Sequence, residues 1–283
     1  MIRVILRGRL GNWLFQYAAG RRLATLRGTD LCLDLSNRRT LRDWKGAQAA
    51  DQLSCFPLQA TLSGGAPVYG RLRRALGLGG HFREGAWGFD PALLDLPDGS
   101  RLFGYFQSER YFADMAPQIR EELTPRLQAA DPPARRLADA MAAIESVAVH
   151  VRRGDYLKLP SHNVCTATYY VRAVKAVRDR VANPRFFVFS DDIAWCRANL
   201  GIDGAEFVDL HGAAGQPVLD LWLMSRCRHQ IIANSTFSWW GAWLNSNPDK
   251  MVAAPSRWFR EEAMNAPALR DTVPASWQRV EVD

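Results

Sequence analysis

The sequence has no apolar run long enough to hold it in a membrane. A bilayer-spanning helix needs roughly 20 consecutive apolar residues, and no stretch of this chain approaches that length. The apolar segment at residues 2–6 is also far shorter than the core of a signal peptide. We therefore expect a soluble cytoplasmic protein, whose basic surface permits only a loose contact with the inner face of the membrane.

The sequence also lacks the cysteine patterns of a disulfide framework or a structural zinc site. It contains five cysteines, an odd number, with no Cys-x-x-Cys pair and no histidines clustered with them at ligand spacing. We predict no metal site and expect each thiol to be a small buried side chain. The cysteines are Cys32, Cys55, Cys165, Cys196 and Cys227.

Lysine is scarce, so the positive charge is almost entirely guanidinium. Lysine and arginine together number 36, the acidic residues 29, and the formal net charge is +7. Arginine suits phosphate recognition, although codon usage would give the same composition. The arginines are spread along the chain and do not alternate with aromatic residues on one element, which argues against a nucleic-acid partner. The lysines are Lys45, Lys158, Lys175 and Lys250.

Internal repeats are absent too, which excludes a solenoid and leaves one large domain or two ordinary ones. The 283 residues are 48% hydrophobic, too apolar for a disordered chain. Residues 124–140 are rich in Pro, Ala and Arg, a composition typical of a connection that leads into a helix. We place the boundary between about residues 125 and 147, with one lobe over 1–135 and a second over 141–283.

Both halves of the chain alternate strand-like and helix-like segments. The first half has a strand at 2–6, a glycine-bearing turn, a helix at about 13–27 and a strand at 30–35. In the second half the predicted strands are 146–151, 185–190, 205–210, 230–233 and, as the last, 251–254. The predicted helices between them are 167–181, 192–200, 218–226 and 237–244. This alternation predicts an α/β fold with parallel sheets, in which ligands bind at the carboxyl ends of the strands.

Two arginines and a carboxylate follow the predicted strand that contains His150. Arg152 and Arg153 stand before Gly154 and Asp155. Arginine makes bidentate contacts with phosphate oxygens, and two in a row allow one to face a ligand while the other pairs internally. The alternative is an Arg–Asp pair that merely closes a turn.

Ser190, Asp191 and Asp192 follow the next strand, where Ser and Asp are favoured caps of the coming helix. Capping explains at least one of them. A second carboxylate at this strand end is placed to accept hydrogen bonds from a guanine base. An adjacent pair of aspartates is weak evidence for a divalent metal.

Asn234, Ser235 and Thr236 lie between a strand and the helix predicted from residue 237. Their polar side chains and the first backbone N–H groups of the helix make an anion site that would fit a diphosphate. The tryptophans that follow are spaced for packing, and for Trp240 and Trp243 we predict a place in the core rather than sugar stacking.

At the amino end, Gly8, Gly11 and Asn12 lie between the first strand and the first helix. Two glycines allow a ligand to approach the backbone, and Asn12 either caps the helix or binds a hydroxyl. The third glycine of a dinucleotide fingerprint is missing, which disfavours a Rossmann dehydrogenase.

Five segments, in order over nearly the whole chain, resemble the motif set of the bacterial α-1,2-fucosyltransferases of glycosyltransferase family 11. They are GRLGNWLFQYA at 8–18, GYFQSERYF at 104–112, HVRRGDY at 150–156, FSDD at 189–192 and NSTFSWWGAWL at 234–244. The resemblance implies an α/β protein of the GT-B type, with two Rossmann-like lobes and a cleft between them. It also implies inverting, metal-independent transfer of L-fucose from GDP-β-L-fucose to the 2-hydroxyl of a galactose in a β-galactoside glycan, without a cofactor.

The same resemblance implies roles for individual residues. Arg152 matches the arginine that contacts the diphosphate, and His150 matches a residue beside the nucleotide. The residues expected to act in catalysis are Arg152, Asp155 and Asn12. The expected nucleotide contacts are His150, Arg152, Arg153, Ser190, Asp192, Asn234, Ser235, Thr236 and Gly11.

The expected mechanism follows from charge. Negative charge grows on GDP as its bond to fucose stretches, and Arg152 is placed to hold it together with N–H groups near Ser235. The acceptor hydroxyl must also lose a proton. Asp155, Glu109 and an oxygen of the departing phosphate are all candidates for the base, and Asp155 is equally suited to orient Arg153.

The first lobe departs from the family pattern in three places. Arg9 replaces the usual second glycine, Trp13 and Leu14 replace Gln-Met, and Arg110 replaces a lysine. These changes concern the acceptor, because the resemblance implies acceptor contacts in that lobe. We expect a terminal β-galactoside in a bacterial surface polysaccharide such as an O-antigen. The alternatives are a fucosyltransferase of another linkage, such as α-1,6, and a noncatalytic glycan-binding protein.

Overall fold

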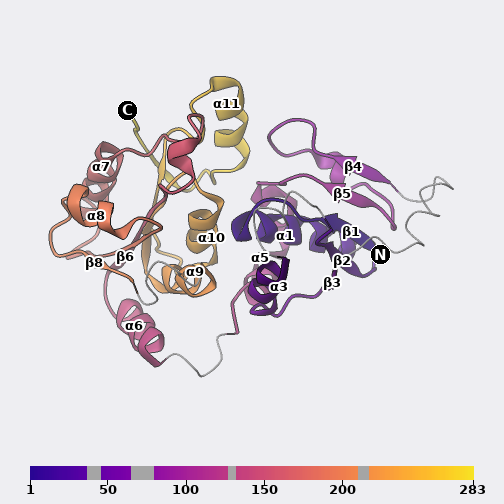
Figure 1. Cartoon of the computed structure of the whole chain (residues 1–283), viewed down its shortest axis with the longest axis horizontal. Helices are drawn as coiled ribbons and strands as arrows, with labels where there is room; N and C mark the ends of the chain where they lie inside the picture. Colours follow the sequence, from indigo (N-terminus) through magenta and orange to yellow (C-terminus); the bar gives the residue numbers. More distant parts are fainter. Residues whose placement is uncertain (37–45, 65–79, 127–131, 210–216) are drawn as a thin grey trace. The chain divides into compact units, whose positions relative to one another are not determined.

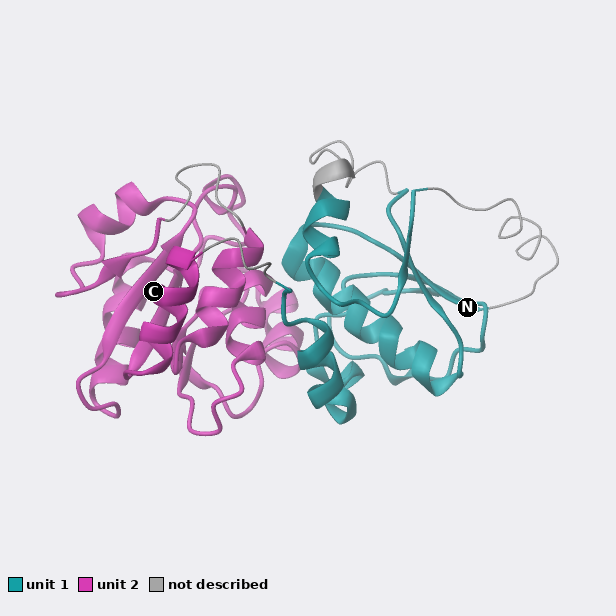
Figure 2. Cartoon of the chain, turned by 90° about the horizontal axis from the view of Figure 1, so that it is seen from below, with its two compact units in different colours: residues 1–126 teal, residues 127–283 magenta. Residues whose placement is uncertain are grey.

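The computed structural model describes residues 1–36, 46–64, 80–126, 132–209 and 217–283. The chain divides into unit 1, residues 1–126, and unit 2, residues 127–283 (Figure 2). Helix α6 (Pro132–Ala142) packs against α9 (Pro217–Arg226), which places α6 in unit 2. Residues 132–135, which the predicted boundary assigns to the first lobe, therefore belong to the second unit.

Unit 1 contains a five-stranded parallel sheet in the order β3-β2-β1-β5-β4 (Figure 1). Its strands are β1 (Ile2–Ile5), β2 (Leu31–Asp34), β3 (Thr61–Ser63), β4 (His81–Arg83) and β5 (Arg101–Phe103). The first two lie where the sequence predicts them. The other three are only three residues long, too short for an apolar pattern to reveal them.

Helix α1 (Leu10–Leu26) follows β1 and packs on the sheet of unit 1. A Cβ at Gly20 would lie 2.4 Å from Val4 Cγ2, so the helix approaches β1 closely because residue 20 has no side chain. The helix begins earlier than the predicted residue 13, which places Gly11 in its first turn. The described residues of unit 1 also form α3 (Gly46–Ser54), α5 (Ala116–Glu122) and the 3-10 turns Pro91–Leu93, Glu109–Tyr111 and Ala113–Met115.

Unit 2 contains a six-stranded parallel sheet in the order β11-β10-β9-β6-β7-β8. Its strands are β6 (Ser146–Val151), β7 (Arg185–Ser190), β8 (Glu206–Phe207), β9 (His229–Ile231), β10 (Val252–Pro255) and β11 (Gln278–Val280). Strands β7 and β8 are added on one side of β6, and β9 to β11 on the other. The order therefore reverses between β6 and β9, and such a switch point is where open α/β sheets bind ligands.

The helical segments of unit 2 alternate with its strands, as predicted. They are α6, the 3-10 turn Tyr156–Lys158, α7 (Ala167–Arg178), α8 (Ile193–Asn199), α9, α10 (Thr236–Leu244) and α11 (Glu262–Asp271). The strand predicted at 251–254 is present as β10, but it is not the last, since α11 and β11 follow it. Pro267 inside α11 and the polar sequence of β11 concealed both elements.

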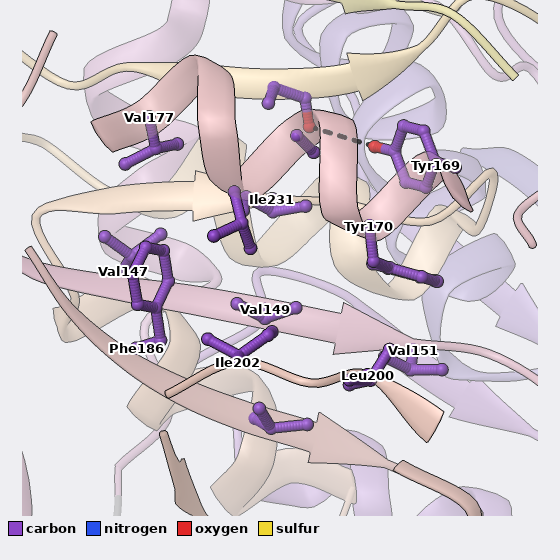
Figure 3. Packing of buried hydrophobic residues seen from close by; sticks show 14 of the residues in the cluster. Val147, Val149, Val151, Tyr169, Tyr170, Val177, Phe186, Leu200, Ile202 and Ile231 are labelled. Atoms are coloured by element: carbon purple, nitrogen blue, oxygen red, sulfur yellow. Dashed lines mark hydrogen bonds between the residues drawn. The ribbon is translucent and has the colours of Figure 1, made fainter. Parts of the chain in front are cut away.

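The sheet of unit 2 has a hydrophobic core on each face. On one face Val147, Val149 and Val151 of β6 pack against Tyr169 and Tyr170 of α7 (Figure 3). On the other, the residues packed together come from β6, β7, α6 and α9; among them are Ala148, Phe187, Phe189, Ala138 and Leu223. Because side chains alternate along a strand, His150 shares the second face with Ala148.

The tryptophans of α10 belong to the core, which confirms the prediction for Trp240 and Trp243. Trp239 and Trp240 are fully buried, and Trp243 is 3% exposed. The ring of Trp239 lies 4.9 Å from that of Trp240 and 5.6 Å from that of Trp277, measured between centres. These rings fix α10, and with it the residues just before the helix, relative to the sheet.

Candidate functional site

The predicted residues of unit 2 meet at one edge of its sheet. Val151, the last residue of β6, pairs with Ser190, the last residue of β7. Val149 pairs with Ile231, the last residue of β9. Because the strands are parallel, the segments that follow them leave from the same edge, on both sides of the switch point.

Arg152 is held by two carboxylates. Its Nη2 donates to Asp155 Oδ1 at 2.5 Å, and its Nη1 lies 2.9 Å from Asp191 Oδ2. The side chain keeps 18% of its surface exposed, and a guanidinium has five N–H donors. The turn-closing Arg–Asp pair is therefore present, and the same arginine retains donors for a ligand.

Arg153 lies along the start of α8 instead. Its Nε donates to Asp192 Oδ2 at 3.1 Å, and its guanidinium carbon lies 3.7 Å from the centre of the Trp195 ring. This cation–π contact and the ion pair hold the side chain in place. The suggestion that Asp155 orients Arg153 is wrong, because Asp155 pairs with Arg152.

Asp191, which is not among the nucleotide contacts expected from the sequence, joins the ends of β6 and β7. Its Oδ1 accepts the backbone N–H of Arg153 at 2.9 Å, while its Oδ2 pairs with Arg152. Gly154 provides the space, since a Cβ there would lie 2.7 Å from Asp191 Oδ2. The only signal in the sequence was a glycine after one strand and a carboxylate after another.

Ser190 and Asp192 form the turn into α8. Asp192 Oδ1 accepts the backbone N–H of Trp195 at 3.0 Å, so this aspartate caps the helix as predicted. Ser190 Oγ accepts the backbone N–H of Asp192 at 2.9 Å. Each carboxylate oxygen of Asp192 therefore has one partner already, and a guanine base would use the remaining lone pairs.

His150 lies buried beside the start of α10. Its ring centre is 5.4 Å from that of Phe237, and its Nδ1 has no hydrogen-bond partner among the described residues. Burial lowers the pKa of His150 to about 3, and the positive charge of Arg152 acts in the same direction. The imidazole is therefore neutral at neutral pH and offers one donor and one acceptor.

The start of α10 has a capped turn. Ser235 Oγ accepts the backbone N–H of Phe237 at 3.3 Å, and Ser235 is the N-cap residue. Ser235 is 5% exposed, whereas Thr236 is only half-buried. A ligand at this helix end would therefore meet Thr236 and backbone N–H groups before it meets the serine hydroxyl.

Asn234 does not point outward as a ligand contact would. Its Nδ2 donates to the backbone carbonyls of His162 at 2.8 Å and of Trp258 at 2.9 Å, which uses both amide protons. This buried side chain therefore links the loops that contain His162 and Trp258 to the end of β9.

Tyr156 is a site residue that the sequence reasoning missed. Its hydroxyl donates to the backbone carbonyl of Asn234 at 3.3 Å, and its ring centre lies 5.6 Å from the guanidinium carbon of Arg152. Burial raises the pKa of Tyr156 to about 12. Tyr156 thus ties the loop after β6 to the start of α10, a role that a tyrosine in a sequence motif does not reveal.

Asn12 and Gly11 belong to unit 1. Asn12 Oδ1 accepts from Gln107 Nε2 at 2.8 Å, and the N-cap of α1 is Arg9, so the capping role considered for Asn12 is wrong. Gly8 has a φ of +74°, and a Cβ there would lie 2.3 Å from Asn12 Nδ2. The glycine is therefore needed both for the turn and for the position of Asn12, while Gly11 is buried in the helix.

Glu109 is also in unit 1, in the 3-10 turn that begins with it. It is half-buried and close to Arg120. Burial lowers the pKa of Arg120, and the charge of Glu109 opposes that change.

Metal ligands and membrane-spanning helices are absent from the part of the chain that the structure describes. No cluster of three or more His, Cys, Asp or Glu side chains there could hold a metal ion. None of the described helices combines the length and the apolar character needed to cross a bilayer. All five cysteines are free; Cys55 and Cys165 are half-buried, so the expected burial holds for only three.

The chain is similar in sequence to glycosyltransferases. The family described as "Glycosyl transferase family 11" matches residues 94–279. An alpha-1,2-colitosyltransferase from Escherichia coli is 38% identical over 189 residues, which are 64% of this chain and 62% of that protein. Galactoside alpha-(1,2)-fucosyltransferase 2 from Mus musculus is 37% identical over 103 residues, which are 35% of this chain and 30% of that protein. The chain thus spans less than two thirds of the length of these curated relatives.

The architecture also has a counterpart among solved structures. The fucosyltransferase NodZ from Bradyrhizobium superposes with a TM-score of 0.52 at 15% identity, over 85% of this chain and 92% of that one. At this identity the likeness concerns the fold alone. Two parallel α/β units of this kind make a GT-B-like fold, which confirms the predicted fold class.

The burial of His150 predicts a pH dependence of stability. Because its pKa is lower in the folded chain than the ordinary value near 6.5, the unfolded chain binds more protons between pH 6.5 and about 3. The contribution of this residue to the free energy of unfolding is therefore intact above pH 6.5 and falls as the pH drops through that window. In urea titrations at a series of pH values, we expect the free energy of unfolding of the His150→Gln variant to lose this part of its dependence on pH. NMR of the imidazole nitrogens should show His150 neutral from pH 8 to 5, and a midpoint near 6.5 would contradict its burial in the neutral form.

Proposed function

Because the chain belongs to glycosyl transferase family 11, we propose that it is a galactoside 2-α-L-fucosyltransferase. It moves L-fucose from GDP-β-L-fucose to the 2-hydroxyl of a terminal galactose and inverts the anomeric centre. The observation that carries this proposal is the position of Arg152, which lies at the switch point of unit 2 with the capped start of α10 across that point. In this proposal unit 2 binds the donor and unit 1 supplies contacts to the acceptor.

The diphosphate of the donor is the ligand that this edge suits best. The exposed part of the Arg152 guanidinium supplies N–H donors, and the first turn of α10 supplies backbone N–H groups and the positive end of its dipole. His150, buried beside that turn, adds a neutral hydrogen-bonding group whose Nδ1 no described residue uses. All of these groups favour an anion that also accepts hydrogen bonds.

The same groups assist the departure of GDP. As the bond between the anomeric carbon and the β-phosphate oxygen breaks, the negative charge on that oxygen grows. Asp155 and Asp191 hold Arg152 in position before the reaction. The guanidinium N–H groups therefore need no reorientation when the charge on the phosphate oxygen develops. Loss of one such preorganised donor typically lowers a rate by about 10²–10³.

The acceptor supplies the electrons and loses a proton. Its 2-hydroxyl oxygen forms the new bond to the anomeric carbon, opposite the leaving phosphate, and its proton passes to a base. Asp155 is already bonded to Arg152, so we assign it first to positioning that arginine. Glu109 and a phosphate oxygen of the departing GDP are then the other candidates for the base.

A second donor has a specific observation in its favour. The Escherichia coli relative, 38% identical over 189 residues, is an alpha-1,2-colitosyltransferase. A colitosyl donor with the same GDP group would use the same contacts at Arg152, so these contacts do not discriminate between the two sugars. The linkage is the same in both cases, and the expected acceptor remains a β-galactoside of a surface polysaccharide made on the cytoplasmic face of the membrane.

The reaction itself is tested with GDP-fucose and a panel of lactose, N-acetyllactosamine and Galβ1,3GalNAc. We expect GDP release together with a product in which NMR shows fucose on O2 of galactose. The reaction should survive EDTA, because the N–H donors of Arg152 and of the first turn of α10 can stabilise the departing phosphate in place of a metal. The colitosyl donor is run in parallel to decide between the two sugars. Fucose on any other atom would overturn the proposed linkage, and loss of activity in EDTA that Mg²⁺ restores would overturn metal independence.

The role of Arg152 is tested with GDP alone. We expect the Arg152→Ala variant to bind GDP more weakly by about 1.5–3 kcal/mol, the range for a hydrogen bond to a charged group. Calorimetry on the full chain measures the affinity. The matched control is Arg178→Ala, because Arg178 also lies over an aromatic ring of unit 2, with its guanidinium carbon 5.4 Å from the centre of Phe186 near the opposite end of β7. Equal affinity of the two variants for GDP would rule out the phosphate role of Arg152.

A further inference from the structure

The carboxyl edge of the unit-1 sheet carries a cluster that neither the core nor the candidate nucleotide site explains. In the order β3-β2-β1-β5-β4, the switch point lies between β1 and β5. Arg7 follows β1, and Tyr105 follows β5. This is the position at which an open α/β sheet binds a ligand.

The guanidinium of Arg7 lies against two aromatic rings. Its carbon is 4.5 Å from the centre of the Phe103 ring and 4.7 Å from that of Tyr105, and the ring of Trp87 lies 6.0 Å from Tyr105. All four side chains are partly exposed. The Arg7 guanidinium makes no hydrogen bond to any residue that the structure describes. Stacking uses the faces of a guanidinium and leaves its N–H donors, which lie in its plane, for a further partner.

A carboxylate next to this cluster, that of Glu84, partly offsets the charge of Arg7. Glu84 accepts the backbone N–H of Tyr105 at 2.6 Å and that of Phe106 at 3.0 Å. Gly104 makes this approach possible, because a Cβ there would lie 2.6 Å from Glu84 Cβ. Burial raises the pKa of Glu84, whereas the two N–H bonds and the charge of Arg7 oppose that change. This half-buried carboxylate offsets one of two positive charges, those of Arg7 and of Arg83, whose guanidinium carbon lies 5.1 Å from the centre of the Phe103 ring. The partly compensated charge suits a polar, uncharged ligand.

The backbone at this edge is in an uncommon conformation. Phe106 is not a glycine, yet its φ is +54°, in the left-handed region that non-glycine residues seldom adopt. The bond from its N–H to Glu84 holds it there. Outliers of this kind cluster at ligand sites, because the surrounding structure must enforce them.

We propose that Arg7, Tyr105 and Trp87 bind a sugar ring of the acceptor glycan. A pyranose has a face of C–H groups that packs on aromatic rings and a rim of hydroxyls that accept hydrogen bonds from a guanidinium. The two rings and the N–H donors of Arg7 match these two features. The proposal rests on the proposed function, from which the class of acceptor comes. It gives a role in acceptor binding to Tyr105, which lies in the motif at 104–112, and to Arg7 and Trp87, which lie outside the motifs.

The test uses Arg7→Leu and Tyr105→Ala in the full chain. We expect each variant to raise the KM for N-acetyllactosamine by roughly five- to twentyfold, because it removes one or two hydrogen bonds or the contact with the ring. The KM for GDP-fucose and the affinity for GDP should stay unchanged. Tyr105→Phe keeps the ring and should keep most of the affinity, which separates stacking from a general loss of structure. Arg178→Leu, an arginine over a single ring in unit 2, is the matched control and should change neither value.

Two outcomes would overturn this assignment. One is an unchanged KM for the acceptor in both variants, and the other is an equal loss of GDP affinity, which would make the cluster part of the donor site or of the fold. Saturation-transfer NMR with lactose, N-acetyllactosamine and Galβ1,3GalNAc measures sugar binding without turnover. If the parent transfers no fucose, the proposed function fails, yet sugar binding that Arg7→Leu abolishes would still support the assignment. A parent chain that binds none of the three sugars would overturn it.

Discussion

The carboxylate of Asp191 occupies the space that a Cβ at residue 154 would need. The candidate donor site depends on this close packing of Asp191 against Gly154. From that position Asp191 accepts the backbone N–H of Arg153 and pairs with Arg152, so it joins the ends of β6 and β7. The edge holds two arginines against three aspartates, which are Asp155, Asp191 and Asp192. In the proposed function, attraction for a diphosphate would therefore come from aimed N–H donors and from the start of α10 rather than from an excess of positive charge.

The same arrangement occurs in unit 1. Gly104 leaves space for Glu84, and this carboxylate accepts the backbone N–H groups of the next two residues, as Asp191 accepts that of Arg153. In both units the glycine follows a central strand and the carboxylate follows its neighbour, β4 beside β5 or β7 beside β6. Asp191 fixes the loop that bears Arg152 and Arg153, and Glu84 fixes the loop that begins with Gly104 and Tyr105. Both loops lie at a switch point, where the fold leaves room for a ligand.

The sequence was sufficient for the elements with strong patterns and insufficient for contacts between distant segments. β6 and β7 are continuous apolar runs, and their predicted bounds are those observed. The contacts of Asp191 could not be predicted, because its partners Arg153 and Arg152 lie 38 and 39 residues earlier and only the strand register brings them together. The sequence predicts Asn234 to be a ligand contact, because a polar residue at a strand end is common to ligand sites and to structural links between loops. Only the packing shows that its amide holds two loops. The three-residue strands of unit 1 are too short to leave a pattern in the sequence. The sequence therefore could not predict that the segments around Arg7, Trp87 and Tyr105 lie close together.

In the proposed function Arg152, held by Asp155 and Asp191, contacts the donor diphosphate. The most direct measurement is NMR of the arginine side-chain N–H groups in the full chain, labelled with ¹⁵N and titrated with GDP and then with GMP, which lacks the second phosphate. We expect the Arg152 signals to shift and to exchange more slowly with solvent in GDP, with a smaller change in GMP and no change at Arg178. Arg152 signals that stay in place while GDP saturates the protein would contradict the claim.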